Sequence, residues 1–182
     1  MKELRRIAKK SIQILCLIGI DLLAFYTALF FSLLLRTELI VHIFNDLPKF
    51  MFSYQYFLNF FWIPLVFIIL NAYENLYTNN LPFWDEARRL VKAITLSSLI
   101  VMAIVTIGNL NIRFSRIVLL GMWFFSLFTF PIFRLWGKKC LYRLGIWRER
   151  VLILGAGNAG RLVSEGISRE KHMGYEIMGF LD

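Results

Sequence analysis

The sequence is poor in cysteine, proline, glycine and acidic residues. Its 182 residues include only 2 cysteines, 4 prolines and 11 glycines. Two cysteines provide neither a disulfide framework nor a zinc-ligand pattern, and so little proline and glycine excludes collagen and low-complexity disorder. Charged residues make up 18% of the chain, against about 25% in a typical soluble domain. The chain is therefore neither a small secreted scaffold nor an ordinary soluble domain.

Apolar residues are correspondingly abundant, at 58% of the chain, and the mean hydropathy is +0.62. A domain of this length has too much surface to hide such an excess in its core. The apolar residues gather in four stretches, at 12–35, 54–72, 90–108 and 117–136. Each stretch approaches the roughly 17–25 residues that a membrane-spanning helix needs, and helices satisfy their backbone hydrogen bonds in lipid. The sequence thus predicts a four-helix transmembrane domain over residues 1–136.

Basic residues lie unevenly around these stretches. Fourteen flank them on one predicted side of the membrane and four on the other. The fourteen are Lys2, Arg5, Arg6, Lys9, Lys10, Arg88, Arg89, Lys92, Arg134, Lys138, Lys139, Arg143, Arg148 and Arg150; the four are Arg36, Lys49, Arg113 and Arg116. Because lysine and arginine accumulate in cytoplasmic loops, we expect a multi-pass membrane protein with both termini in the cytoplasm. The net charge of +9 then reflects membrane flanks, and no nucleic-acid partner is expected.

Asp21 is the acidic residue deep in the first stretch. Burying a carboxyl group at that depth is costly, so we expect it to face the bundle and to hydrogen-bond hydroxyls such as those of Ser98 or Ser126. A structural bond is favoured over a proton relay, because the predicted spans place no second charged group at this depth. The segment from Pro82 is predicted to form a short helix along the cytoplasmic face, and His172 is expected to be solvated.

The pattern changes after the fourth stretch. Residues 137–149 are basic and aromatic and predict a connector. Within 150–182, a short apolar strand at 150–154, a helix at 158–171 and a second strand at 175–181 are predicted. The expected fold is therefore mainly α: a transmembrane bundle followed by the β-α-β start of a Rossmann-like α/β domain. Its sheet is incomplete as given, so the sequence is expected to be a piece of a longer protein.

The turn after the first predicted strand carries the fingerprint Gly155-x-Gly157-x-x-Gly160, and Asp182 follows at the end of the second strand. In Rossmann folds such glycines allow a pyrophosphate to approach the helix N-terminus, and the acidic residue bonds a ribose. These four residues are therefore candidate nucleotide-binding residues. The alternative is that the glycines only allow helix and strand to pack. The pattern predicts no catalytic residue and no metal site.

The order of these parts resembles the N-terminal region of the bacterial undecaprenyl-phosphate hexose-1-phosphate transferases, the large polyprenyl phosphoglycosyl transferases. The resemblance rests on Asp21 in the first span and on four segments. They are ENLYTNNLPFWDEARR, SRIVLL…PIFRLWGKK, GIWRERVLILGAGNAGRL and MGYEIMGFLD.

The resemblance implies an enzyme that moves a hexose 1-phosphate from a UDP-sugar to undecaprenyl phosphate with the help of Mg²⁺. This reaction starts O-antigen, capsule or exopolysaccharide synthesis. The catalytic acids of the family lie in a further C-terminal domain, so no catalytic or Mg²⁺-binding position is carried over to this stretch. What this stretch would contribute is the membrane anchor and the start of a regulatory or dimerising domain, which makes a homodimer an expected assembly.

Three other interpretations remain. The first is the N-terminal part of a membrane-bound, NAD-dependent nucleotide-sugar dehydratase or epimerase of polysaccharide biosynthesis, which shares the spans and the glycine turn. The second is a channel or transporter, which would require a selectivity filter or several charges inside the membrane. The third is an anchor without activity.

Overall fold

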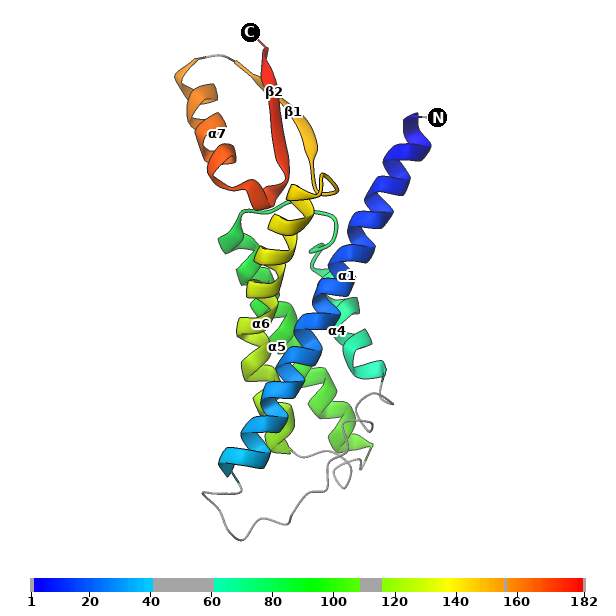
Figure 1. Ribbon diagram of the computed structural model, residues 1–182. Coiled ribbons are helices and arrows are strands. Elements are labelled where there is room, and N and C mark those ends of the chain that lie inside the picture. Colours follow the sequence, from blue (N-terminus) through cyan, green and yellow to red (C-terminus); the bar gives the residue numbers. More distant parts are fainter. Residues whose placement is uncertain (1, 41–60, 109–115, 156, 182) are drawn as a thin grey trace.

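The computed structural model describes residues 2–40, 61–108, 116–155 and 157–181. It is mainly helical. Figure 1 shows a bundle of long helices with a small α/β unit at one end, where the start of α1 and the end of β2 both lie.

Two long helices form the frame of the bundle. α1 spans Lys2–Leu34 and continues as the π-helical turn η1, Leu35–Ile40, while α6 spans Arg116–Arg143. Their close packing is seen at Gly137 of α6, where an added Cβ would collide with the Ile20 side chain of α1. Further along, the Ser32 hydroxyl donates a 2.6 Å hydrogen bond to the carbonyl oxygen of Val118. The pairing of α1 with α6 thus joins the first and last long helices of the bundle.

Two further helices complete the bundle, α4 at Trp62–Tyr73 and α5 at Phe83–Ile107. Within the described residues, three helical segments are long and apolar enough to cross a membrane: Ile7–Thr37, Phe83–Ile107 and Arg116–Arg143. α4 is apolar but shorter, and the start of the predicted span 54–72 lies outside the described residues. The first, third and fourth predicted spans are therefore present as candidate membrane helices, and the second, at 54–72, stays a prediction.

The surface helix predicted from Pro82 is not a separate element. Pro82 is the N-cap of α5, and Asp85 and Glu86 lie in its first turn. The helix then continues without a break to Ile107. The prediction of a helix lying along the membrane face was wrong because Glu86, although acidic, is buried in the bundle, where two basic groups compensate its charge.

Aromatic rings fill the centre of the bundle. The ring of Phe67 in α4 lies 5.3 Å from that of Phe25 in α1 and stacks at 5.9 Å on that of Phe130 in α6. All three side chains are buried. Because aromatic pairs at such distances add stabilisation beyond their buried area, this cluster holds three helices together around one core.

The α/β unit follows α6. Strand β1 (Glu149–Leu154), helix α7 (Asn158–Arg169), the 3₁₀ turn η3 (Lys171–Met173) and strand β2 (Tyr175–Leu181) follow in order. β1 and β2 are parallel neighbours, so the predicted β-α-β order is confirmed. The Rossmann-like character of the unit stays a prediction. α6 extends to Arg143, so the first half of the predicted connector 137–149 is helical.

Candidate functional site

Asp21 and Arg134 form a buried ion pair between α1 and α6. Their side chains are 2% and 1% exposed. The guanidinium donates two hydrogen bonds to the carboxylate, Nε to Oδ1 at 2.8 Å and Nη2 to Oδ2 at 2.6 Å. Such a two-bond arrangement is the strongest geometry available to this pair. Asp21 does face the bundle, as expected from the sequence.

The predicted partners of Asp21 were wrong. The hydroxyls of Ser98 and Ser126 are buried and have no hydrogen-bond partner among the described residues. The expectation treated Arg134 as a flank residue in water, whereas α6 continues beyond it and carries its guanidinium into the bundle. The second charged group, which the sequence analysis did not place at the depth of Asp21, is therefore Arg134.

Two neutral donors complete the surroundings of the carboxylate. The Tyr77 hydroxyl donates to Oδ2 of Asp21 at 2.6 Å, and Nδ2 of Asn71 donates to the same oxygen at 3.0 Å. The ring of Tyr77 also lies 5.1 Å from the Arg134 guanidinium, within reach of a cation–π interaction. Groups from α4 and from the turn after it thus converge on Asp21.

A second acid continues the network. Nη1 of Arg134 donates to Oε1 of Glu86 at 3.2 Å and to the carbonyl oxygen of Leu76 at 3.1 Å. The Lys138 ammonium donates to the same Glu86 oxygen at 2.7 Å. Glu86 and Lys138 are both almost fully buried. Two carboxylates and two cations therefore balance in what we call the buried charge network: Asp21, Glu86, Arg134 and Lys138.

This balance decides what the network can do. A buried ion pair stabilises a protein only when its remaining donors and acceptors are also bonded, and here backbone and neutral side chains meet that condition. Each acid has a basic partner. The arrangement therefore favours the structural role expected for Asp21 over a proton relay, and it specifies how four segments of the bundle pack.

The network also contacts the α/β unit. The Lys138 ammonium lies 5.2 Å from the ring centroid of Trp147, and the Trp147 indole Nε1 donates to the carbonyl oxygen of His172 at 3.0 Å. His172 packs edge-on against Phe83 of α5 at 6.3 Å. The prediction that His172 is solvated was wrong: it is 6% exposed, and this burial lowers its pKa below 6.5.

The buried charge network could be found from sequence only through helix periodicity. Phe130, Arg134 and Lys138 recur every four residues and therefore share one face of α6. Because Phe130 is apolar, that face points into the bundle, and the two cations must follow it. The sequence predictions counted both cations among the basic residues that flank the spans, although the predicted span 117–136 contains Arg134, and so assigned them to water.

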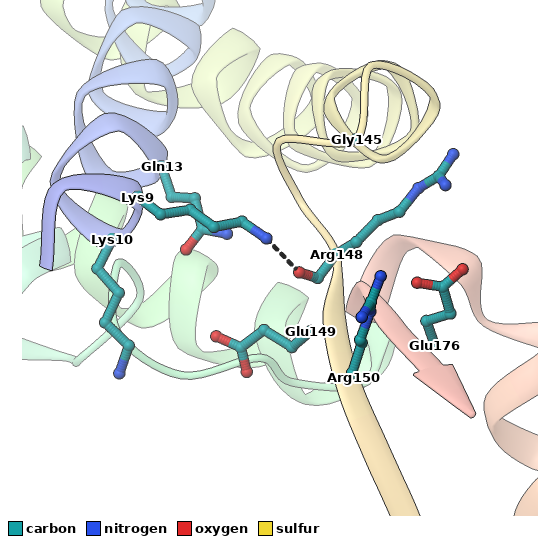
Figure 2. Close-up of a pocket in the computed structure, with 8 residues that line it drawn as sticks. All are labelled: Lys9, Lys10, Gln13, Gly145, Arg148, Glu149, Arg150 and Glu176. Carbon is teal, nitrogen blue, oxygen red and sulfur yellow. Dashed lines mark hydrogen bonds between the residues drawn. The ribbon is translucent and has the colours of Figure 1, made fainter. Parts of the chain in front are cut away.

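A cavity of about 620 Å³ lies between the first turns of α1 and the start of β1. Figure 2 shows Lys9 reaching across it, and its ammonium donates to the carbonyl oxygen of Arg148 at 2.7 Å. Lys10 and Arg150 line it as well, but so do the carboxylates of Glu149 and Glu176. With Arg148, four cations therefore line this cavity, and two carboxylates compensate part of their charge.

The glycine turn has the local geometry that the fingerprint predicts. Gly155 adopts a φ of +95°, which favours glycine. Gly160 is buried, and a Cβ there would collide with the carbonyl oxygen of Gly155. Gly157 is the N-cap of α7, whose first turn has neither an acidic residue nor a side-chain cap. Packing of helix on strand explains Gly160, and nucleotide binding stays a prediction; Asp182 lies outside the described residues.

A metal site has no support in the residues that the structure describes, which contain no group of three or more histidine, cysteine or acidic residues. The buried acids are already paired with Arg134 and Lys138. They therefore do not fit Mg²⁺, which prefers free carboxylate oxygens and water.

Comparison with known proteins supports the resemblance seen in the sequence. No family model matches the chain. It is 32% identical over 106 residues to the undecaprenyl-phosphate galactose phosphotransferase of Salmonella typhimurium and 24% identical over 106 residues to the UDP-galactose-lipid carrier transferase of Erwinia amylovora. It is 26% identical over 105 residues to an uncharacterized sugar transferase of Haemophilus influenzae.

Each of these matches covers 58% of this chain but only 22% of the relative. The chain thus spans about a fifth of the length of the curated relatives it matches. The resemblance to the N-terminal region of the undecaprenyl-phosphate hexose-1-phosphate transferases is confirmed: over more than half of its length, the chain is similar to a curated undecaprenyl-phosphate galactose phosphotransferase and to curated sugar transferases.

Proposed function

We propose that this chain is the membrane-anchoring N-terminal part of a sugar transferase. The parent enzyme would move a hexose 1-phosphate from a UDP-sugar to undecaprenyl phosphate, releasing UMP, at the start of O-antigen, capsule or exopolysaccharide synthesis. The observation that carries the proposal is the 32% identity to the Salmonella phosphotransferase, in a chain with three candidate membrane helices. The names of the relatives favour this function over a dehydratase or epimerase.

An anchor suits this chemistry. A lipid-linked acceptor is confined to the bilayer, and a catalyst held at the same surface meets it in a restricted volume and orientation. The buried charge network would hold the α/β unit against the end of the bundle. The catalytic residues and the Mg²⁺ of the reaction would then belong to the parts of the relatives that this chain does not span.

The proposed location is the bacterial cytoplasmic membrane, with both termini in the cytoplasm. Figure 1 shows the two ends of the chain at the same end of the bundle. The basic residues Lys9, Lys10, Arg148 and Arg150 gather there, and the positive-inside rule assigns such an end to the cytoplasm. A homodimer through the α/β unit is part of the same proposal.

A chimaera tests the proposal. The matching N-terminal region of the Salmonella phosphotransferase is replaced by residues 1–182, and membranes are assayed for transfer of label from UDP-galactose to undecaprenyl phosphate. We expect the chimaera to remain in the membrane and to transfer label. Purified residues 1–182 by themselves are expected to transfer none. A matched chimaera with an unrelated four-helix anchor is the control: activity with that anchor, but none with residues 1–182 at equal membrane level, contradicts the proposal.

A further inference from the structure

A second cavity, also about 620 Å³, lies where α6 meets the α/β unit, and it shares Arg148 with the cavity of Figure 2. Four cations from α6, the connector and α7 line it: Lys139, Arg143, Arg148 and Arg169. None of the described residues that line it is acidic. In the cavity of Figure 2, by contrast, Glu149 and Glu176 stand among the cations. The described lining of the second cavity therefore has four cations and no carboxylate, while the Glu170 carboxylate stands 3.8 Å from His172, which also lines it.

Two apolar side chains, Leu135 and Phe83, also line this cavity. Leu135, Lys139 and Arg143 follow each other at intervals of four residues on one face of α6, so the lining changes from apolar to basic over about 12 Å along the helix axis. A ligand that fills the cavity must itself be apolar at one end and negatively charged at the other.

Exposed tryptophans place this change of polarity at the membrane surface. Trp84 and Trp136 are 79% and 73% exposed, and they are the sequence neighbours of Phe83 and Leu135. Tryptophan side chains gather at the head-group level of a bilayer. The apolar part of the cavity thus lies at the boundary of the hydrocarbon, and the cations lie on its aqueous side.

Two polar side chains are already oriented for a ligand. The Arg148 guanidinium lies over the ring of Tyr142 at 5.0 Å, and its Nε donates to the Tyr142 carbonyl oxygen at 2.9 Å. This holds the planar group in place and leaves its terminal nitrogens for an anion. His172 also lines the cavity, and its side chain is 7% exposed.

The Nε2 atom of His172 is buried without a hydrogen-bond partner among the described residues. The Oε2 atom of Glu170, which is also buried without a hydrogen-bond partner among the described residues, stands 3.8 Å away, which exceeds hydrogen-bond distance. A buried polar atom without a partner is unfavourable. A ligand oxygen in the cavity would satisfy it, which makes His172 a second, independent indication of a ligand.

We propose that this cavity binds the phosphomonoester head group of a membrane lipid. The phosphate lies among Arg143, Arg148 and Arg169, and the hydrocarbon chain passes Leu135 and Phe83 into the bilayer. Four cations without an acid suit a dianionic monoester better than the single charge of a phosphodiester, and guanidinium groups bind phosphate oxygens in pairs. The proposal does not depend on the sugar-transferase function, because it concerns lipid binding by this chain whatever enzyme it anchors.

Lipid titration of the full chain in detergent, followed by native mass spectrometry, tests the proposal. The probes are phosphatidic acid (a phosphomonoester), phosphatidylglycerol (a diester), phosphatidylcholine and the water-soluble glycerol 3-phosphate. We expect phosphatidic acid to bind at least about tenfold more tightly than either diester lipid. Glycerol 3-phosphate should displace it only at about hundredfold higher concentration, because it lacks the apolar part.

The variant R143Q/R169Q removes two exposed cations from the cavity and should weaken phosphatidic acid binding about tenfold or more, since it deletes charge-assisted contacts. The matched control K10Q/R150Q removes the same charge from the cavity of Figure 2 and should change binding less than about twofold. Unchanged thermal unfolding shows that each variant folds. If R143Q/R169Q unfolds early, K139Q replaces it, with about threefold weaker binding expected.

Three results overturn the proposal. Equal losses in the two double variants mean general attraction of an acidic lipid to a basic surface. If phosphatidylglycerol binds as tightly as phosphatidic acid, the cavity does not select a phosphomonoester. If glycerol 3-phosphate binds as tightly as phosphatidic acid, the cavity binds a soluble phosphate and not a lipid.

Discussion

The Arg134 guanidinium lies against the Asp21 carboxylate in a two-bond ion pair whose members are 113 positions apart in the chain. Asp21 belongs to the first helix of the bundle and Arg134 to the last, and both are excluded from solvent. Neither charge has water to compensate it if its partner is lost. This pair therefore makes the packing of α1 on α6 depend on two side chains.

Removing one member should be far more harmful than removing both. We expect D21N and R134M each to lower the free energy of unfolding by about 3–5 kcal/mol, because R134M leaves the buried Asp21 carboxylate without a cation and D21N leaves two buried cations to the single carboxylate of Glu86. The double variant should lose clearly less free energy of unfolding than the two single variants lose together, since it removes both charges. Thermal unfolding of the four proteins in one detergent gives the coupling.

An exposed ion pair provides the control for this cycle. Lys92 and Glu74 are joined at 2.7 Å, but the Lys92 side chain is 69% exposed. K92Q should change stability by less than about 1 kcal/mol. Losses in D21N and R134M that are no larger than in K92Q, or that simply add in the double variant, would contradict the role given to the pair.

The helices and strands were predictable because their signals are local. The apolar run at 117–136 lies within α6, the run at 90–108 ends at the C-cap of α5, and the β-strand predicted at 175–181 coincides with β2. Apolar length and alternation depend on neighbouring residues. The ends were less well placed: α1 begins at Lys2, because lysine, arginine and glutamate are good helix formers even where the apolar pattern has not begun.

The buried charge network was not predictable in the same way. Its members come from α1, α5 and α6, so their contact depends on how the helices pack. The sequence analysis also counted Arg134 and Lys138 as cytoplasmic flank residues and therefore missed their burial. A cation near the end of an apolar stretch has the same sequence signature whether it pairs inside the bundle or faces water. His172 was misjudged for the same reason, since its burial depends on Trp147 and Phe83, residues distant in sequence.

Gly160 should tolerate no side chain. In G160A the added Cβ would meet the Gly155 carbonyl oxygen in the turn before α7, and we expect a loss of about 1–3 kcal/mol from overpacking. The effect should be confined to the α/β unit and is measured by the amide hydrogen exchange of β1, α7 and β2. G166A is the matched control: no atom lies within 4 Å of its Cβ, so it should be neutral or stabilise α7 by up to about 1 kcal/mol. Equal exchange in the two variants would show that the turn accommodates the methyl group.

Both ends of the chain should lie on the cytoplasmic side. Reporter fusions after residues 80 and 145 are expected to give cytoplasmic signals, and fusions after residues 45 and 112 periplasmic signals, because the basic residues flank the spans on one side. Alkaline phosphatase and green fluorescent protein, which are active on opposite sides, provide matched readouts at each position. A periplasmic signal at 80 or 145 would be incompatible with this topology.

Acidification should loosen the α/β unit through His172. Burial lowers the pKa of this histidine below its ordinary 6.5, and Lys138 and Lys139 lower it further, whereas Glu170 and Glu86 act in the opposite direction. When η3 and β2 are undocked, His172 is exposed to water and titrates at its ordinary pKa. As the pH falls, the undocked state therefore takes up a proton before the docked state does. Docking of η3 and β2 is therefore fully stable above about pH 6.5 and is progressively lost below it, down to the lowered pKa.

Hydrogen exchange of residues 171–181, corrected for its intrinsic pH dependence, measures this effect between about pH 7.5 and about pH 5.5, the interval in which histidine titrates. Protection should fall on acidification in the natural chain. H172F keeps an aromatic ring against Phe83 but cannot titrate, so its protection should stay constant over the same interval. If the variant loses protection as the natural chain does, the pH dependence must arise from other groups. The exchange of α1 provides the internal reference, because its packing on α6 does not involve His172.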